Sequence, residues 1–130
     1  MFVDSSVLVA ILSDEETAGQ YAQRFENASG CVTTPLVVLE SAMRLSSKLV
    51  VDPIDVGAVI ARFLADARIT VVAIEPADTD IAIDAFQRYG KGRGHPARLN
   101  LADCLTYSCA RRMGVGLLYK GDDFSKTDLA

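Results

Sequence analysis

The sequence predicts an α/β protein, a three-layer α/β/α domain in which helices flank a short parallel sheet. Short apolar runs alternate along the chain with longer segments that have helical periodicity and helix caps. Strands separated by helices imply crossover connections, which place the strands parallel in one sheet. Because the chain has 130 residues, 50% of them hydrophobic, and no internal repeat or linker, we expect a single domain over residues 1–130.

Helix-start signals divide the chain into its elements. Ser13 and Glu16 have the spacing of a capping box, which predicts a helix start just after Ser13. Thr34-Pro35 and Asp52-Pro53 each combine an N-cap residue with the proline that is favoured at the first helical position. From these signals and the periodicity, we expect helices at residues 5–12, 14–27, 35–48 and 53–66.

The strands are expected at short apolar runs, at residues 1–4, 31–33, 70–74 and 115–119. The third run is β-branched and apolar, which predicts a buried strand. Nearly uniform apolar strands are typical of a sheet that is covered on both faces. Two further helices are expected, one at residues 78–89 and one that Asn100 caps and Gly114 ends.

Composition and charge limit the classes of function. The net charge is −4 and the isoelectric point about 4.9, so a nucleic-acid partner would need a local basic patch or bound cations. The 3 cysteines form no Cys-x-x-Cys pair, which argues against a disulfide framework or zinc knuckle and favours a reducing compartment. The longest apolar run, Val7 to Leu12, is too short to span a bilayer, and no signal-peptide pattern is present, so we expect a cytoplasmic protein.

Acidic side chains from four separate segments are expected at one edge of the sheet. Asp4 ends the first predicted strand, and Asp122 and Asp123 directly follow the last one. Glu40 lies about two turns into the helix after the second strand, and Asp103 lies in the first turn of the last helix. Because sites in open parallel sheets form outside the carboxyl ends of the strands, we expect these acids to converge.

Each of these acids also has an ordinary structural interpretation. Asp4 fits a polar strand end, Asp103 fits a helix cap, and Asp122-Asp123 fits a turn. Glu40 fits a solvated helix residue, but its neighbours in the sequence are almost all apolar, and buried acids are almost always partnered. The joint placement of all the acids at one edge favours a functional site.

A carboxylate cluster without imidazole or thiolate ligands indicates a hard divalent cation, Mg²⁺ or Mn²⁺. The only histidine, His95, lies in a predicted loop, so the chain offers no Ser-His-Asp set. Without a cation, clustered carboxylates would repel one another. Such a site suits phosphodiester hydrolysis, because a cation neutralises charge on the phosphate and lowers the pKa of an attacking water.

Four stretches of the chain resemble a PIN domain and, more narrowly, the VapC toxins of bacterial toxin–antitoxin pairs. They are FVDSSVLVAIL, LVVLESAMRL, GKGRGHPARLNLADCLTYSCA and LLYKGDDFSKTDL. The resemblance implies a PIN-like fold and a Mg²⁺-dependent endoribonuclease, usually a homodimer, that a co-expressed VapB antitoxin inhibits. It also implies that Asp4, Glu40 and Asp103 hold the metal, Asp4 and Asp103 most directly.

The fourth acid departs from the pattern of that family. Many members have Thr-x-Asp-x-Asp-Phe after the last strand, whereas this chain has KGDDF, with Gly121 at the usual position of the first acid. Either Asp122 or Asp123 replaces that acid, or the site works with three acids and water. We expect Asp122 to complete the catalytic set with the three metal-holding acids.

A glycine-rich basic segment leads into Asp103. Its cationic residues, with no acid among them, are Arg88, Lys91, Arg93, His95 and Arg98. Glycines let backbone N–H groups approach phosphate, and the cations supply charge that the rest of the chain lacks. We expect this segment to bind RNA; a solvated surface loop, an antitoxin contact and a contact with a second subunit are the alternatives.

Two other functions fit parts of the sequence. A phospho-acceptor receiver domain is also a parallel α/β domain that binds Mg²⁺, and it has a lysine after the last strand, where Lys120 stands. It requires paired acids after the first strand and an acceptor Asp after the middle strand, where this chain has only Asp4 and Glu75. A catalytically silent PIN-like binding module is the second alternative, which loss of one of the acids would have favoured.

Overall fold

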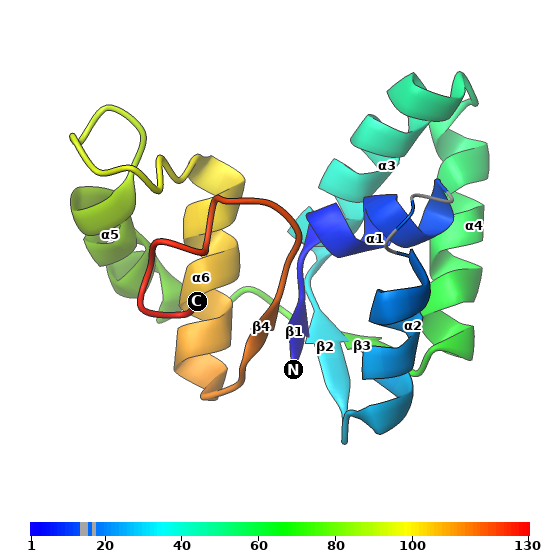
Figure 1. Ribbon diagram of the computed structural model, residues 1–130, viewed down its shortest axis with the longest axis horizontal. Helices are drawn as coiled ribbons and strands as arrows, with labels where there is room; N and C mark the ends of the chain where they lie inside the picture. Colours follow the sequence, from blue (N-terminus) through cyan, green and yellow to red (C-terminus); the bar gives the residue numbers. More distant parts are fainter. Residues whose placement is uncertain (14–15, 17) are drawn as a thin grey trace.

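The computed structural model describes residues 1–13, 16 and 18–130. It has a four-stranded parallel sheet with helices on both sides (Figure 1). The register aligns Phe2 with Val32 on one side and with Leu117 on the other. The predicted α/β class and parallel sheet are therefore confirmed. In spatial order, the strands are β3 (Ile69–Val71), β2 (Cys31–Thr33), β1 (Phe2–Val3) and β4 (Leu117–Leu118).

The helices form two groups. Helices α1 to α4 lie to one side of the strands, and α5 and α6 lie beside each other on the other side (Figure 1). This arrangement gives the predicted three layers. The helix bounds are α1 (Ser5–Leu12), α2 (Ala18–Asn27), α3 (Pro35–Leu49), α4 (Pro53–Asp66), α5 (Asp78–Tyr89) and α6 (Leu101–Met113).

Side-chain caps explain where two of the helices begin. Thr34 caps α3, because its Oγ1 accepts a hydrogen bond from the Val37 backbone N–H at 3.5 Å. Asn100 and Asp103 form a reciprocal capping box at the start of α6. Helix α6 ends at Gly114, whose φ of 66° is in the left-handed region that glycine adopts without strain. These predicted caps are confirmed, whereas Asp52 makes no side-chain cap bond to α4.

The region between α1 and α2 differs from the prediction. Ser13 does not open the second helix; it ends the first, and its hydroxyl donates to the Val9 carbonyl oxygen at 2.6 Å. Helix α2 begins at Ala18, and three residues of the predicted first turn, 14, 15 and 17, lie outside the described residues. The Ser13 hydroxyl oxygen also accepts a hydrogen bond from Lys48 Nζ at 3.1 Å, so these two bonds join Ser13 to parts of the protein other than α2.

The predicted buried strand at residues 70–74 is wrong in length and in burial. Strand β3 covers Ile69–Val71, and only Ile69 is buried, while the Val71 side chain is 45% exposed. β3 is one of the two edge strands of the described sheet and pairs with β2. An apolar run alone does not distinguish an edge strand from a central one. β4 is also shorter than the predicted 115–119.

The sheet brings three chain segments to one edge. β1, β2 and β4 run parallel, so α1, α3 and the C-terminal residues all start beside the same end of the sheet. The strand residues Phe2 and Val3 are fully buried, which anchors this edge to the core. The N-terminus of α6 lies at the same edge in Figure 1. The chain segments that carry the predicted acids therefore meet at one edge of the sheet, as expected from the sequence.

Candidate active site

A small polar cavity of about 220 Å³ lies at this edge of the sheet. Four carboxylates line it, and each comes from a different segment: the end of β1, α3, the first turn of α6 and the residues after β4. The lining residues are Asp4, Ser5, Ser6, Glu40, Arg44, Asn100, Asp103, Lys120 and Asp123. Three of the four acids predicted from the sequence thus lie around one cavity.

Asp4 is the N-cap of α1 and is only 5% exposed. Its Oδ2 accepts hydrogen bonds from the backbone N–H of Ser6 at 3.0 Å and from the Ser6 hydroxyl at 2.6 Å. Burial raises the pKa of Asp4, and the bonds from Ser6 and the charge of Arg44 oppose that rise only in part. The Ser6 hydroxyl also accepts from the Lys120 backbone N–H at 2.9 Å, which ties Asp4 to the end of β4.

Asp103 serves both the helix and the cavity. Its Oδ2 accepts from the Asn100 backbone N–H at 3.0 Å, so the interpretation as a helix cap is correct, and the residue still lines the cavity. Burial raises the pKa of Asp103 to about 7, despite the opposing bond from Asn100. The charges of Asp123, Asp4 and Glu40 add to that rise, which shows that the four acids interact electrostatically.

Glu40 enters the cavity from the second turn of α3. Its side chain is half-buried, and its Oε1 accepts a hydrogen bond from the Ser5 hydroxyl. The neighbouring Leu39 and Met43 are 58% and 62% exposed, so the apolar residues near Glu40 in the sequence do not form a closed shell around it. Glu40 lines the cavity and has Ser5 as its hydrogen-bond partner, as is expected of an acid that is not fully solvated.

The fourth acid at the cavity is Asp123, not the expected Asp122. Gly121 has a φ of 97°, a left-handed conformation that turns the chain immediately after Lys120. Both side chains are exposed after this turn, but Asp123 lines the cavity and Asp122 does not. The two acids are adjacent in a segment without strand or helix periodicity, so no pattern in the sequence distinguishes them.

Comparisons with known proteins show the family to which the chain belongs. The family model described as the PIN domain matches residues 1–129. A VapC ribonuclease of Rhizobium meliloti (strain 1021) is 41% identical over 140 aligned positions that cover 98% of this chain and 98% of that relative. This chain belongs to the VapC family of PIN-domain ribonucleases. The predicted family and enzyme class are confirmed, and the receiver-domain alternative is wrong.

A further relative agrees with this assignment, and two solved structures share the fold. Ribonuclease VapC42 of Mycobacterium tuberculosis (strain H37Rv) is 34% identical, covering 99% of this chain and 96% of that relative. VapC20 of Mycobacterium tuberculosis, described as a toxin that cleaves the sarcin-ricin loop, superposes with a TM-score of 0.73 at 15% identity over 95% of this chain and 92% of its own. A toxin–antitoxin complex from Klebsiella pneumoniae gives 0.70 at 14% identity, over 98% of this chain and 92% of that chain. At these identities the structures confirm the fold alone.

Sequence reasoning did not single out the cationic and hydroxyl groups of this VapC-family cavity. Arg44 lines it four residues after Glu40, and its Nη1 donates to the Ser5 hydroxyl at 3.4 Å. Residues at this spacing share one face of a helix, so the pair Glu40–Arg44 was a usable signal. Lys120 lines the cavity from the end of β4. The cavity therefore combines acids that suit a cation with basic groups that suit a phosphate.

The donor set fits a hydrated divalent cation. Within the described part of the chain, no three His, Cys, Asp or Glu side chains are close enough to enclose a metal ion by themselves. Mg²⁺ does not require such a cage, since it typically binds one or two carboxylates and keeps several waters. Two buried acids with raised pKa values, Asp4 and Asp103, would be relieved of desolvation and repulsion by a cation.

The five predicted RNA-binding cations differ in their position and in their partners. Arg88 belongs to α5 and is engaged by Asp84 at 3.4 Å and Asp128 at 3.5 Å. Arg93 lies over the Phe86 ring, with its guanidinium carbon 5.9 Å from the ring centre. His95 is half-buried, and its Nδ1 accepts from the Ala97 backbone N–H at 3.1 Å. Lys91, Arg93 and Arg98 are exposed on the segment that leads to Asn100 and the cavity.

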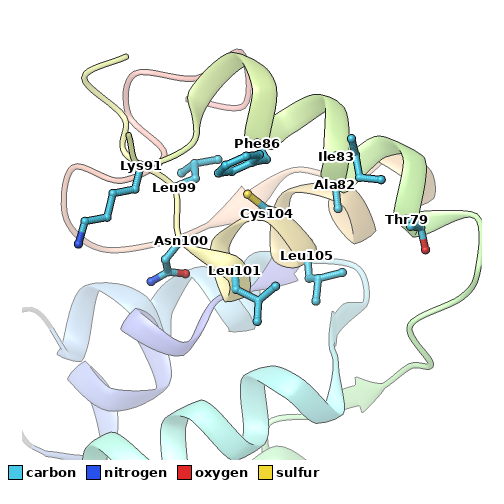
Figure 2. A pocket seen from close by; sticks show the side chains of 10 residues that line it. All are labelled: Thr79, Ala82, Ile83, Phe86, Lys91, Leu99, Asn100, Leu101, Cys104 and Leu105. Carbon is cyan, nitrogen blue, oxygen red and sulfur yellow. The ribbon is translucent and has the colours of Figure 1, made fainter. Parts of the chain in front are cut away.

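An apolar groove of about 540 Å³ lies between α5 and α6, beside the carboxylate cavity. Figure 2 shows Phe86 and Ile83 projecting from α5, and Leu101 and Leu105 belonging to α6. Asn100 lines both this groove and the carboxylate cavity. The groove thus places an exposed apolar surface directly next to the acids.

In the described residues, no helix is long and apolar enough to cross a membrane.

Proposed function

We propose that this VapC-family protein is a Mg²⁺-dependent endoribonuclease, in which Mn²⁺ can substitute, and that it is the toxin of a toxin–antitoxin pair. The observation that supports this most directly is the cavity itself. Four carboxylates from four segments surround it, and the pKa of one of them, Asp103, is raised to about 7. Perturbed carboxylates that line a common cavity are typical of an active site.

The residues of the chain would divide the work of phosphodiester hydrolysis among them. Asp4, Glu40 and Asp103 would hold the cation, with the Asp4 carboxylate oriented by Ser6. When bound, a divalent cation lowers the pKa of water and neutralises charge on the phosphate. Asp123 would add a fourth carboxylate to the set that holds the cation.

The RNA-binding surface would be narrower than the predicted set of five cations. Lys91 and Arg98 are exposed and close in sequence to Asn100 at the cavity rim. Arg93 is exposed as well, although its guanidinium lies near Phe86. Arg88 and His95 have protein partners that account for them. We therefore assign phosphate contacts to Lys91, Arg93 and Arg98, because exposed cations release counterions when they bind RNA.

The antitoxin would act on the same cavity. An acidic cavity that admits RNA also accepts an arginine or lysine side chain, which pairs well with carboxylates. The cognate VapB-like antitoxin would occupy the site with such a residue and exclude RNA. A ribonuclease that a co-expressed protein inhibits would act in the cytoplasm, where both are made.

Two copies of the chain would associate as a homodimer through the groove between α5 and α6. Ile83, Phe86 and Leu101 are 59%, 47% and 79% exposed there, which is a large apolar surface to leave in water. Replacing Ile83 and Phe86 with serine should convert a dimer to a monomer in sedimentation or light scattering. An unchanged mass would place the dimer interface elsewhere.

A cleavage assay tests the proposed function. Pure protein should cut mixed RNA when Mg²⁺ or Mn²⁺ is present, and EDTA should stop the reaction. Equal cleavage in EDTA would refute the metal mechanism. Absence of both cleavage and metal binding would instead favour the catalytically silent binding module.

A further inference from the structure

The last residues of the chain, 121–130, form no helix or strand, and we call them the C-terminal strap. In Figure 1 the strap crosses α6 toward α5. Its internal backbone bonds are local: the Thr127 N–H donates to the Phe124 oxygen at 3.0 Å, and the Ala130 N–H donates to the Thr127 oxygen at 3.3 Å. Turns of this kind do not attach a segment to the rest of the protein, so side chains must do so.

Two side chains attach the strap to the helices and the sheet. Phe124 is 1% exposed, and its ring lies 5.5 Å from the ring of Tyr119. Asp128 accepts a hydrogen bond from the Tyr107 hydroxyl at 2.8 Å, and the Arg111 Nη2 lies 3.1 Å from its carboxylate. Arg88 contacts the same carboxylate from α5 at 3.5 Å.

The charge of Asp128 matters to this contact. Burial acts to raise the pKa of Asp128, but the Tyr107 hydrogen bond and the charges of Arg111 and Arg88 outweigh it and hold the pKa below its usual value. Burial and the bond to Asp128 raise the pKa of Tyr107 to about 12, so the tyrosine keeps its proton and remains a donor. The anchor is therefore an ionised carboxylate held by three donors from two helices.

Asp123 lies on the part of the strap between the end of β4 and this anchor. It directly precedes Phe124 and follows the left-handed turn at Gly121, and no regular element supports its backbone. A carboxylate on such a segment stays at the cavity only if the segment is held beyond it. Phe124 holds the strap directly beside Asp123 by packing in the core, and Asp128 holds it farther along through Tyr107 and the arginines.

We propose that Asp128 is a positioning residue that holds Asp123 in the active site by fastening the C-terminal strap to Tyr107, Arg88 and Arg111. This inference rests on the proposed function, because it assigns Asp123 a part in metal-dependent cleavage. It also gives Arg88 a role other than RNA contact. Arg88 Nη2 also donates to the hydroxyl of Tyr89, the last residue of α5, at 2.6 Å, so the strap is linked to the end of that helix.

A double-mutant cycle tests whether Asp128 acts through Asp123. Asp128→Ala should lower both kcat and Mn²⁺ affinity by about 10- to 100-fold, as is typical when the support of a metal-site ligand is removed. In an Asp123→Asn background, Asp128→Ala should cause little further loss of either quantity. Coupled residues give such non-additive effects, whereas independent ones add.

Two further variants serve as controls. Asp84→Ala removes another carboxylate that contacts Arg88, at 3.4 Å, but leaves the strap attached, so cleavage should stay at the wild-type rate. Tyr107→Phe removes only the hydroxyl that donates to Asp128 and should give an intermediate loss. It keeps the aromatic ring in the core, so it remains informative if Asp128→Ala does not fold.

The outcomes separate this inference from the proposed function. If the wild type cleaves no RNA with Mg²⁺ or Mn²⁺, the proposed function fails, and Mn²⁺ affinity across the cycle still tests the strap. Wild-type kcat and Mn²⁺ affinity in Asp128→Ala would overturn the positioning role. The other contrary outcome is that Asp128→Ala lowers kcat and Mn²⁺ affinity equally in the wild-type and Asp123→Asn backgrounds. That result would also overturn the positioning role, because Asp128 would then act independently of Asp123.

Discussion

Asp103 and Asn100 exchange two hydrogen bonds: Asn100 Oδ1 accepts from the Asp103 N–H at 2.9 Å, and Asp103 Oδ2 accepts from the Asn100 N–H at 3.0 Å. The same carboxylate that begins α6 therefore faces the three other acids of the cavity. This relationship holds Asp103 rigidly in a position where its charge is unfavourable. The helix cap and the active site share one group, and mutation can separate the two roles.

Asp103→Asn should separate them. An amide oxygen still accepts from the Asn100 N–H, so the cap survives, but the charge that would balance a cation is lost. We expect cleavage to fall by more than about 100-fold, beyond the loss typical of outer-shell partners. The metal-free variant should melt at the wild-type temperature or above it, since a buried, repelled charge is removed. If Asp103→Asn is destabilised but fully active, Asp103 is a helix cap and not an active-site residue.

The pH dependence of metal-free stability follows from the same residue. The folded pKa of Asp103 is raised from 3.8 to about 7, so the folded state binds its proton more tightly than the unfolded state does. Stability should therefore fall as pH rises from about 4 to about 7, and Asp4, whose pKa is also raised, acts in the same direction. Denaturant melts in EDTA across this window should show the fall, and Asp103→Asn should flatten it. A flat wild-type profile would contradict the raised pKa.

Asp123 and Asp122 form a matched pair for testing the fourth acid. Only Asp123 lines the cavity, and its charge contributes to the raised pKa of Asp103. Asp123→Asn should reduce cleavage and Mn²⁺ affinity by about 10-fold or more, and Asp122→Asn should leave both unchanged. Single-turnover assays and calorimetric titration measure the two quantities. The reverse result would restore the assignment made from the sequence.

These adjacent acids illustrate how much of the site the sequence could predict. Asp4, Glu40 and Asp103 were predictable because each lies at a recognisable place in a strand–helix pattern, and parallel strands direct such places to one edge. Asp123 was not predictable over Asp122, because its position depends on a turn at Gly121 and on contacts that Phe124 and residues farther along the strap make. Long-range packing of an irregular segment leaves no periodic signal.

In the fold, too, local signals were predictable from the sequence, and features that depend on long-range packing were not. Helix α3 and the start of α6 were predictable from local caps at Thr34 and Asn100. The edge position of β3 was not, because exposure of Val71 depends on which strands pair, and an apolar run carries no such information. Ser13 had the right residue type for a helix start, but its hydroxyl bonds back to Val9. The residue type alone therefore did not show to which of the two helices Ser13 belongs.

The basic segment should set the salt dependence of RNA binding. Replacing Lys91, Arg93 and Arg98 with alanine should weaken binding and flatten its dependence on salt, by about 0.7 in log–log slope for each single-strand phosphate that the variant no longer neutralises. Mn²⁺ affinity should not change. A control triple of Arg24, Arg62 and Arg68, which line neither the cavity nor the groove, removes the same charge and should leave the slope as it was. Unaltered RNA binding with loss of dimer or antitoxin binding would make the segment a protein interface.

Arg44 should distinguish phosphate binding from metal binding within the cavity. Its guanidinium lies on the same face of α3 as Glu40 and donates only a long hydrogen bond, 3.4 Å, to Ser5, so it can reorient toward a phosphate. Arg44→Ala should lower kcat/KM for RNA by about 100-fold, the loss typical when one stabilising donor is removed. Mn²⁺ affinity should stay the same or rise, because a positive charge beside the carboxylates is gone. Arg44→Lys keeps the charge without the bidentate geometry and should recover part of the activity. Parallel losses of Mn²⁺ affinity and cleavage in Arg44→Ala would show instead that Arg44 supports the carboxylates rather than the RNA.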